Sequence, residues 1–192
     1  MDRQAGLTRA GFVLEGTTLA WNVVGVVVLT IAAITARSVA LAGFGLDSLI
    51  EIGASTVVIW GLSGSNEHRQ RVGLRLIGVA FLLLAVYLSV QSTVVLVLGF
   101  HAHHSTLGIV WTGTTAAVMY LLAAGKAHVG GALQHPVLQA EGKVTLVDGL
   151  LATAVVLGLA LNASLGWWWA DPVAAYVLLI YALKEGRTVL RS

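Results

Sequence analysis

The segment SVALAGFGLDSLIEIGASTVVIWGL, residues 38–62, sets two acidic side chains, Asp47 and Glu51, in a run that is otherwise mostly apolar or small. Such a run is long enough to cross the hydrocarbon core of a bilayer as a helix, which needs about 20 residues. A carboxylate at that depth is costly unless it is paired, protonated or facing water. The segment therefore predicts a membrane-spanning helix whose acids have a function.

The rest of the chain has the composition of an integral membrane protein. Of its 192 residues 57% are hydrophobic and 10% are charged, which is outside the range of soluble domains. We therefore predict one all-α transmembrane domain, 1–192, with six spanning helices at about 12–36, 39–62, 76–100, 107–124, 137–161 and 167–183. The Trp residues at 167–169 suit an interfacial anchor at the start of the last helix.

The basic residues predict the orientation of these helices. If the N-terminus is cytoplasmic, the only basic residue on the outside is Arg37, and the inner side contains Arg3, Arg9, Arg69, Arg71, Arg75, Lys126, Lys184, Arg187 and Arg191. Both termini are thus expected in the cytoplasm. The Ala, Val and Gly bias is compatible with a bacterial plasma membrane.

Other classes of function find little support. The formal net charge of +2 is too small to indicate a nucleic-acid partner, and the chain has no Cys for a thiolate metal site. Dinucleotide, Walker, catalytic-triad and HExxH patterns are missing from the sequence, so we do not expect an enzyme.

A second acid-bearing helix is predicted at 137–161. Its Glu141 and Asp148 are seven residues apart and so lie nearly on one helical face, as Asp47 and Glu51 do at a spacing of four. At about 1.5 Å per residue, Asp47 lies about 13 Å from the outer surface and Asp148 about 14 Å from the inner one, in a core of about 30 Å. We therefore expect Asp47 and Asp148 at one depth. The alternative is that the acids only hydrogen-bond within the bundle interior.

The two acid-bearing segments also align with each other. A shift of 97 residues lays Glu51 on Asp148, and Asp47 on Val144. Because three helices separate the copies, they run in opposite directions, which is typical of inverted repeats with a site between the halves.

Three stretches carry a resemblance to a known family: SVALAGFGLDSLIE, HPVLQAEGKVTLVD and GWWWADPVAAYVLLIYALKEG. Over most of residues 10–187 the chain resembles the transmembrane part of the cation diffusion facilitator family. The likeness implies a homodimeric metal-ion/proton antiporter of six helices. The motif GFGLDS, residues 43–48, and the short tail after the last predicted helix resemble a smaller branch of this family that lacks the cytoplasmic C-terminal domain.

In that family the second and fifth helices each supply a pair of His or Asp ligands spaced by four. Carried over to this chain, the likeness implies that Asp47, Glu51 and Asp148 are metal ligands, while Val144 stands where a fourth ligand is usual. Asn22 of the first helix lies at the same predicted depth and is a further candidate ligand. Oxygen ligands accept zinc, which we expect first, and also Mn, Fe, Co or Cd.

Other polar residues are accessory candidates. Glu15 and Glu141 share a predicted height near the inner surface and could form an acidic entrance. Lys143 could offset the charge of Glu51, although a lysine that snorkels to the surface is the interpretation we favour. The loop histidines are a weaker candidate for collecting ions, namely His101, His103 and His104.

Helix contacts and helix ends can be predicted as well. We expect the glycines of the two acid-bearing helices to let these helices approach each other, namely Gly43, Gly45, Gly142 and Gly149. Asp171 before Pro172 is typical of a helix start.

The predicted function is divalent metal cation transport, as zinc efflux by metal/proton antiport in a lipid bilayer. The direction and the exchange come from the resemblance. Two alternatives remain: a metal-responsive or partner-binding membrane protein of the same fold that does not transport, and a proton-coupled transporter of another small solute.

Overall fold

The computed structural model describes residues 2–36, 38–63, 67–99 and 105–191. These residues form six α-helices and no strand: α1 Asp2–Ala36, α2 Val39–Leu62, α3 Glu67–Leu98, α4 Thr106–Leu133, α5 Pro136–Leu165 and α6 Ala170–Arg191. The predicted all-α architecture is confirmed within the described chain.

Most helices are longer than the apolar segments that predicted them. The bounds of α2 match the prediction, whereas α1 begins at Asp2 instead of 12, α3 at Glu67 instead of 76, and α4 continues to Leu133 instead of 124. The difference arises because hydropathy falls where charged residues begin, while backbone hydrogen bonding continues into the polar ends of a helix.

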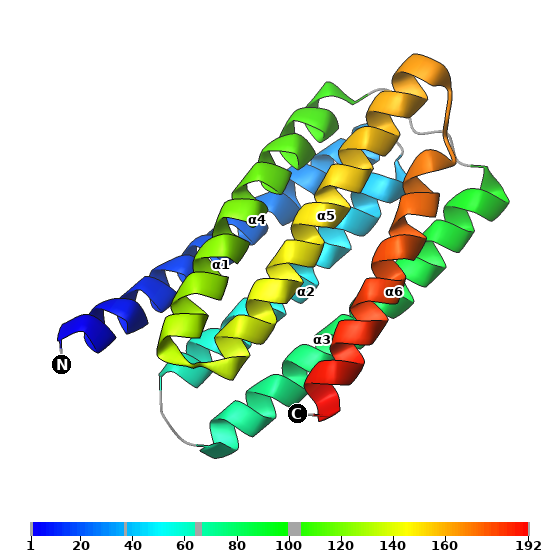
Figure 1. Ribbon diagram of the computed structural model, residues 1–192. Helices are drawn as coiled ribbons and strands as arrows, with labels where there is room; N and C mark the ends of the chain where they lie inside the picture. The colour runs from blue at the N-terminus through cyan, green and yellow to red at the C-terminus, as the bar shows by residue number, and fades with distance from the viewer. Residues whose placement is uncertain (1, 37, 64–66, 100–104, 192) are drawn as a thin grey trace.

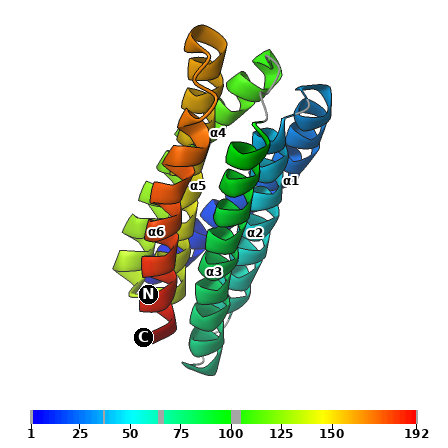
Figure 2. The ribbon, with the colours of Figure 1, turned by 90° about the vertical axis from the view of Figure 1, so that its right-hand side faces the viewer.

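The helices pack in pairs that differ from their order along the chain. α1 packs with α2, α4 with α5, and α3 with α6, as Figures 1 and 2 show. α5 also contacts α2, α3 and α6, so it is the most central helix of the bundle. Both chain ends lie at the same end of the bundle, as the six-helix prediction requires (Figure 2).

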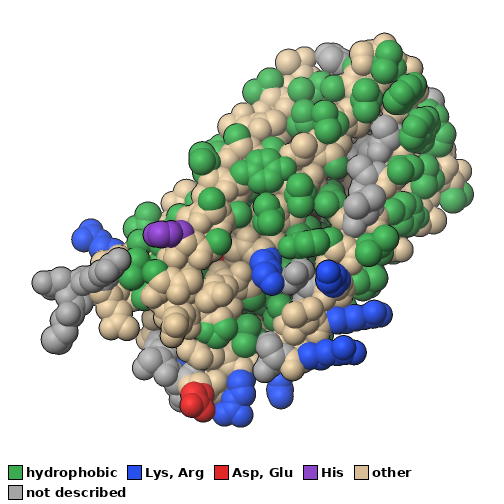
Figure 3. Space-filling model, in the orientation of Figure 1, with side chains coloured by type: hydrophobic (Ala, Val, Ile, Leu, Met, Phe, Trp, Pro, Cys, Tyr) green, Lys and Arg blue, Asp and Glu red, His purple; other side chains and the backbone are tan. Residues whose placement is uncertain are grey.

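The outer surface of the bundle is apolar. Large side chains such as Ile34, Val97 and Leu121 are 72 to 76% exposed, which suits contact with lipid. The helices α1 to α5 are long and apolar enough to cross a membrane. Lys and Arg side chains gather toward the end that contains both termini (Figure 3).

Local signals explain where several helices start and stop. Ser38 and Ser105 are N-caps whose hydroxyls accept hydrogen bonds from the N–H groups of Leu41 and Gly108. α5 ends at Leu165 and is capped by Gly166, which has a positive φ of 70° that favours glycine.

The last helix starts three residues after the predicted bound of about 167, and close to Asp171 and Pro172, which were expected to mark a helix start. α6 begins at Ala170, with Pro172 in its first turn, and the chain before it forms a turn in which Trp167 stacks on Trp169 with ring centroids 5.5 Å apart. Proline is tolerated in the first turn of a helix, where its missing N–H has no intrahelical partner.

The predicted role of the glycines is wrong. The nearest atoms to a Cβ built on Gly43 belong to Tyr87 and Gln91 of α3, and those nearest to Gly142 belong to α4. These two glycines therefore lie at the contacts of α2 with α3 and of α5 with α4, where a Cβ would have to displace a neighbouring side chain. The nearest atoms to a Cβ on Gly45 belong to α1, and those nearest to Gly149 belong to α4. The contact between α2 and α5 is made instead by polar side chains.

Candidate functional site

α2 and α5 run antiparallel, and their polar side chains meet in successive layers. Near the middle of the bundle the carboxyl groups of Asp47 and Asp148 face each other. One turn along α2, Glu51 accepts a hydrogen bond from Thr145 at 2.6 Å. One turn further, Ser55 donates to Glu141 at 3.3 Å. Each step of about four residues toward the C-terminus of α2 is matched by a step toward the N-terminus of α5, as two antiparallel helices require.

The outer layer is the pair Asp47 and Asp148. Their side chains lie in the core, at 3% and 2% exposure. Asp47 Oδ2 and both carboxyl oxygens of Asp148 have no hydrogen-bond partner among the described residues. Buried polar atoms nearly always have a partner, so oxygens in this state have the capacity to bind a cation or a proton.

The inner layer centres on Thr145 of α5. Its hydroxyl donates to Glu51 Oε1 at 2.6 Å and lies 3.1 Å from Glu141 Oε1. The hydroxyl oxygen of Thr145 also accepts a hydrogen bond from Lys126 Nζ at 2.9 Å. A hydroxyl has one donor and two acceptor lone pairs, and Thr145 uses both functions here.

Lys126 of α4 is a candidate site residue that the sequence did not indicate. It was expected in an inner loop, yet its side chain is fully buried and forms ion pairs with Glu141 at 2.6 Å and with Glu15 at 3.2 Å. The expectation is wrong because α4 runs past 124 to Leu133, which places Lys126 inside the helix. A lone lysine followed by further apolar and small residues was the available signal.

Glu15 and Glu141 do come together, as their predicted common height requires. Both are fully buried and bind the same ammonium group, so they do not open to the surface in this conformation. The acidic entrance stays a prediction.

The remaining candidates have varied surroundings. Asn22 is buried on α1 and donates its amide N–H to Thr18 O at 3.0 Å, and its role as a ligand stays a prediction. Val144 packs in the hydrophobic core. Lys143 lies on an exposed part of α5, in agreement with the snorkelling interpretation. The histidines at 101, 103 and 104 lie outside the described residues.

The three acids implied as metal ligands are not gathered at one point. Within the described part of the chain no three His, Asp or Glu side chains are close enough to hold a metal ion. Asp47 and Asp148 face each other, while the carboxylate of Glu51 is bound to Thr145 one turn away. A site made from all three acids would require the carboxyl group of Glu51 to move toward the two aspartates.

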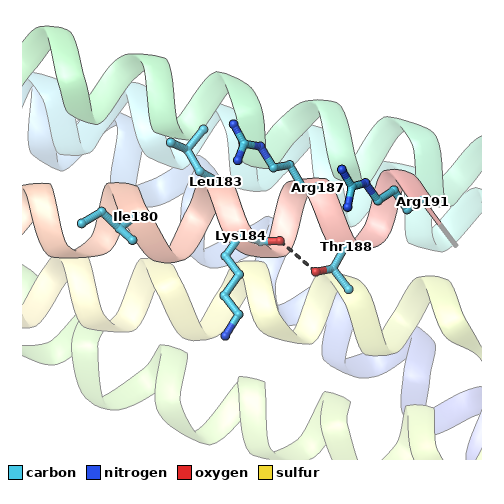
Figure 4. A pocket seen from close by; sticks show the side chains of 6 residues that line it. All are labelled: Ile180, Leu183, Lys184, Arg187, Thr188 and Arg191. Carbon is cyan, nitrogen blue, oxygen red and sulfur yellow. Dashed lines mark hydrogen bonds between the residues drawn. The ribbon is translucent and has the colours of Figure 1, made fainter.

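A second polar feature lies at the end of α6. A surface hollow of about 370 Å³ is lined by residues that include Lys184, Arg187 and Arg191, and Figure 4 shows their charged groups projecting from the helix. Thr188 donates its hydroxyl to the carbonyl of Lys184 at 2.9 Å. All three basic residues belong to the set that was predicted on the inner side.

Comparison with known proteins bears on the class of this site. A search of curated proteins found no match. The family described as the cation efflux transmembrane domain matches residues 17–192, which is most of the chain and covers every acid of the candidate site except Glu15. The members of this family are transporters and not enzymes. The chain therefore belongs to the cation efflux family and is an integral membrane protein of the metal-cation transporter class.

Proposed function

We propose that this protein exports a divalent metal ion, zinc in the first instance, in exchange for protons. The observation that carries the proposal is the contact between Asp47 on α2 and Asp148 on α5, deep in the bundle. Three of the four carboxyl oxygens of this pair have no hydrogen-bond partner in the part of the chain that the structure describes. Acids at membrane depth that face one another are typical of ion and proton pathways.

In the proposed cycle a metal ion arrives from the end that contains both termini. It binds Asp47 and Asp148, and Glu51 completes the site after its carboxyl group moves toward them. Protons from the opposite side then compete for the same carboxyl oxygens and release the metal. Access alternates between the two sides of the membrane around this fixed pair of helices.

The ligand chemistry supports a divalent ion and leaves several metals possible. Carboxylates bind zinc and also suit manganese and iron(II), because none of these oxygen donors selects strongly for a softer metal. We take zinc as the first substrate to test, with Mn, Fe, Co and Cd as competitors. The choice of zinc comes from the family likeness.

The setting of the protein is proposed on similar grounds. The basic hollow on α6 and the Lys and Arg side chains around it support a cytoplasmic location for both termini. We further propose a homodimer in a bacterial plasma membrane. Chemical crosslinking in native membranes tests the dimer.

The decisive experiment is metal-dependent proton flux in proteoliposomes. Asp47→Asn and Asp148→Asn should each abolish the flux, because each removes one of the two facing carboxylates. Glu67→Gln is the matched control, since Glu67 is an exposed acid of α3 and should leave the flux unchanged. Normal flux in both Asn variants would reject this site.

Bound-metal analysis of the purified protein separates the alternatives. Stoichiometric zinc in the wild type, and none in the double Asn variant, supports transport through the Asp pair. No metal in either protein would favour a membrane protein of this fold that binds a partner or moves another solute.

A further inference from the structure

The ammonium group of Lys126 occupies the inner acidic layer as a bound cation would. Its Nζ contacts three oxygens from two helices other than its own: Glu141 at 2.6 Å, Thr145 at 2.9 Å and Glu15 at 3.2 Å. The ammonium donates hydrogen bonds to Glu141 and Thr145, and its contact with Glu15 Oε2 is an ion pair without a hydrogen bond. Lys126, Glu15 and Glu141 are all fully buried.

The oxygens around Lys126 exceed what one ammonium can bind. Among the described residues, Glu15 Oε1, Glu141 Oε2 and Glu51 Oε2 have no hydrogen-bond partner, although their carboxyl groups belong to this layer or border it. An isolated ion pair would not need a third carboxyl group beside it. The two carboxyl groups and the hydroxyl that contact Lys126 Nζ, from Glu15, Glu141 and Thr145, are oxygen donors of the kind that divalent ions prefer.

We propose that Lys126 is a tethered cation that fills a second divalent-ion site, formed by Glu15, Glu141 and Thr145, and so restricts the protein to the ion held by the Asp pair. Lys126 is thus a specificity-determining residue, acting through the charge it places in the inner layer. This inference rests on the proposed function only in naming the outer site, and it can be tested separately.

The packing of α4 supports a fixed position for this lysine. Gly142 of α5 lies against Lys126, and a Cβ on this glycine would come within 3.1 Å of the lysine Cβ. The close approach lets the lysine stem enter the bundle between α1 and α5 instead of extending to the surface. Lys143, on the exposed part of the neighbouring helix, has no such path and serves as the control.

The test measures Mn²⁺ bound per chain to purified protein, by equilibrium dialysis and elemental analysis. Lys126→Met should bind one Mn²⁺ per chain more than the wild type. Lys126→Arg and Lys143→Met should bind as the wild type does, because each leaves a cation in the inner layer. The gain should vanish in Lys126→Met with Glu141→Gln. A Lys126→Met protein that is folded and binds no additional Mn²⁺ would overturn the proposal.

The same measurement in the Asp47→Asn, Asp148→Asn background separates this inference from the proposed function. There, Lys126→Met should still gain its ion, since the inner site does not use those two residues. An inner ion gained while the wild type binds none supports the tethered cation and counts against the proposed outer site. If the wild type binds an ion and Lys126→Met binds no additional one, the result supports the proposed outer site and counts against the tethered cation.

Loss of Lys126 could also unfold the protein, because it leaves buried carboxylates without a counter-ion. In that case the thermal midpoint of Lys126→Met is measured with and without Mn²⁺. Recovery toward the wild-type midpoint in Mn²⁺, but not in Na⁺ at equal ionic strength, supports the second site. A midpoint that Mn²⁺ does not raise contradicts it.

Discussion

Thr145 Oγ1 lies 2.6 Å from Glu51 Oε1 and joins α5 to α2 one turn from the facing pair of aspartates. The same hydroxyl oxygen accepts a hydrogen bond from Lys126 at 2.9 Å. Thr145 therefore connects the acid that is implied as a third metal ligand to the lysine that fills the inner layer. The hydrogen bond engages only Oε1 of Glu51, and its Oε2 has no hydrogen-bond partner among the described residues, so the threonine holds one carboxylate oxygen while the other can bind an ion.

Replacing Thr145 with Val removes the hydroxyl and keeps the shape. Glu51 Oε1 then loses its donor in a buried position, and an unsatisfied buried polar group costs about 1–3 kcal/mol of the free energy of unfolding. Thr145→Ser keeps the hydroxyl and should retain most of the stability. Thermal unfolding in detergent checks both variants, and equal loss in Val and Ser would show that the methyl group, not the hydrogen bond, matters here.

The ion pairs of Lys126 predict an order of stabilities. Removing one partner of a buried pair leaves an uncompensated charge and costs about 3–5 kcal/mol, so Glu141→Ala should be strongly destabilising. Glu15→Ala should cost less, because Lys126 keeps its shorter contact, 2.6 Å to Glu141 against 3.2 Å to Glu15.

The control for this order is Glu67→Ala. Glu67 forms an exposed pair with Arg71 at 3.8 Å, and surface pairs contribute little. Unfolding midpoints of the three variants, measured side by side, should therefore rank Glu141 first, Glu15 second and Glu67 last. A Glu141→Ala protein as stable as Glu67→Ala would show that the buried pair is not a stabilising element.

The sequence predicted what depends on regular geometry. A fixed rise per residue placed Asp47 and Asp148 at one depth, and the structure has their carboxyl groups facing each other. The bounds of α2 were predictable because the apolar run is complete and Ser38 caps its start.

Rotation and packing of the helices were not predictable in the same way. Hydropathy ended the fourth helix before Lys126, so the lysine was counted with the surface charges, and its burial depends on contacts with α1 and α5 that no local pattern contains. The hydrogen bond between Thr145 and Glu51 could not be predicted, for a related reason. A threonine beside Val144 looks like an ordinary helix residue until the angle at which α2 crosses α5 is known.

A side chain on Gly142 should separate α4 from α5. In Gly142→Ala the new methyl group would lie 3.1 Å from Lys126 Cβ, and overpacking of this kind costs about 1–3 kcal/mol. The shift also moves Lys126 away from Glu141. Gly131→Ala is the control, since a Cβ there meets no atom within 4 Å and alanine is the better helix former. Thermal midpoints should fall for the first variant only, and an unchanged midpoint in Gly142→Ala would mean that the helices can move apart without cost.

His135 makes the start of α5 sensitive to pH. Its Nδ1 accepts a hydrogen bond from the N–H of Leu138 at 3.2 Å, and the imidazole also hydrogen-bonds the backbone of Gly61 at the end of α2. Burial lowers the pKa of His135 below its ordinary value of 6.5 and outweighs the hydrogen bonds, which raise it. The folded protein thus holds this proton more weakly than the unfolded chain does. The stability contributed by the neutral ring is complete above pH 6.5 and is lost as the pH falls below that value.

His135→Asn tests this because asparagine is a good N-cap that does not titrate. The free energy of unfolding, compared at about pH 5 and about pH 8 on either side of the histidine range, should fall more for the wild type than for His135→Asn. His135→Ala should cost about 0.5–2 kcal/mol at the higher pH, as loss of a cap does. His68→Asn, at an exposed histidine of α3, should keep the wild-type pH dependence. If His135→Asn kept it as well, the acid sensitivity would lie elsewhere in the bundle, because protonation at His135 is then not what weakens the start of α5.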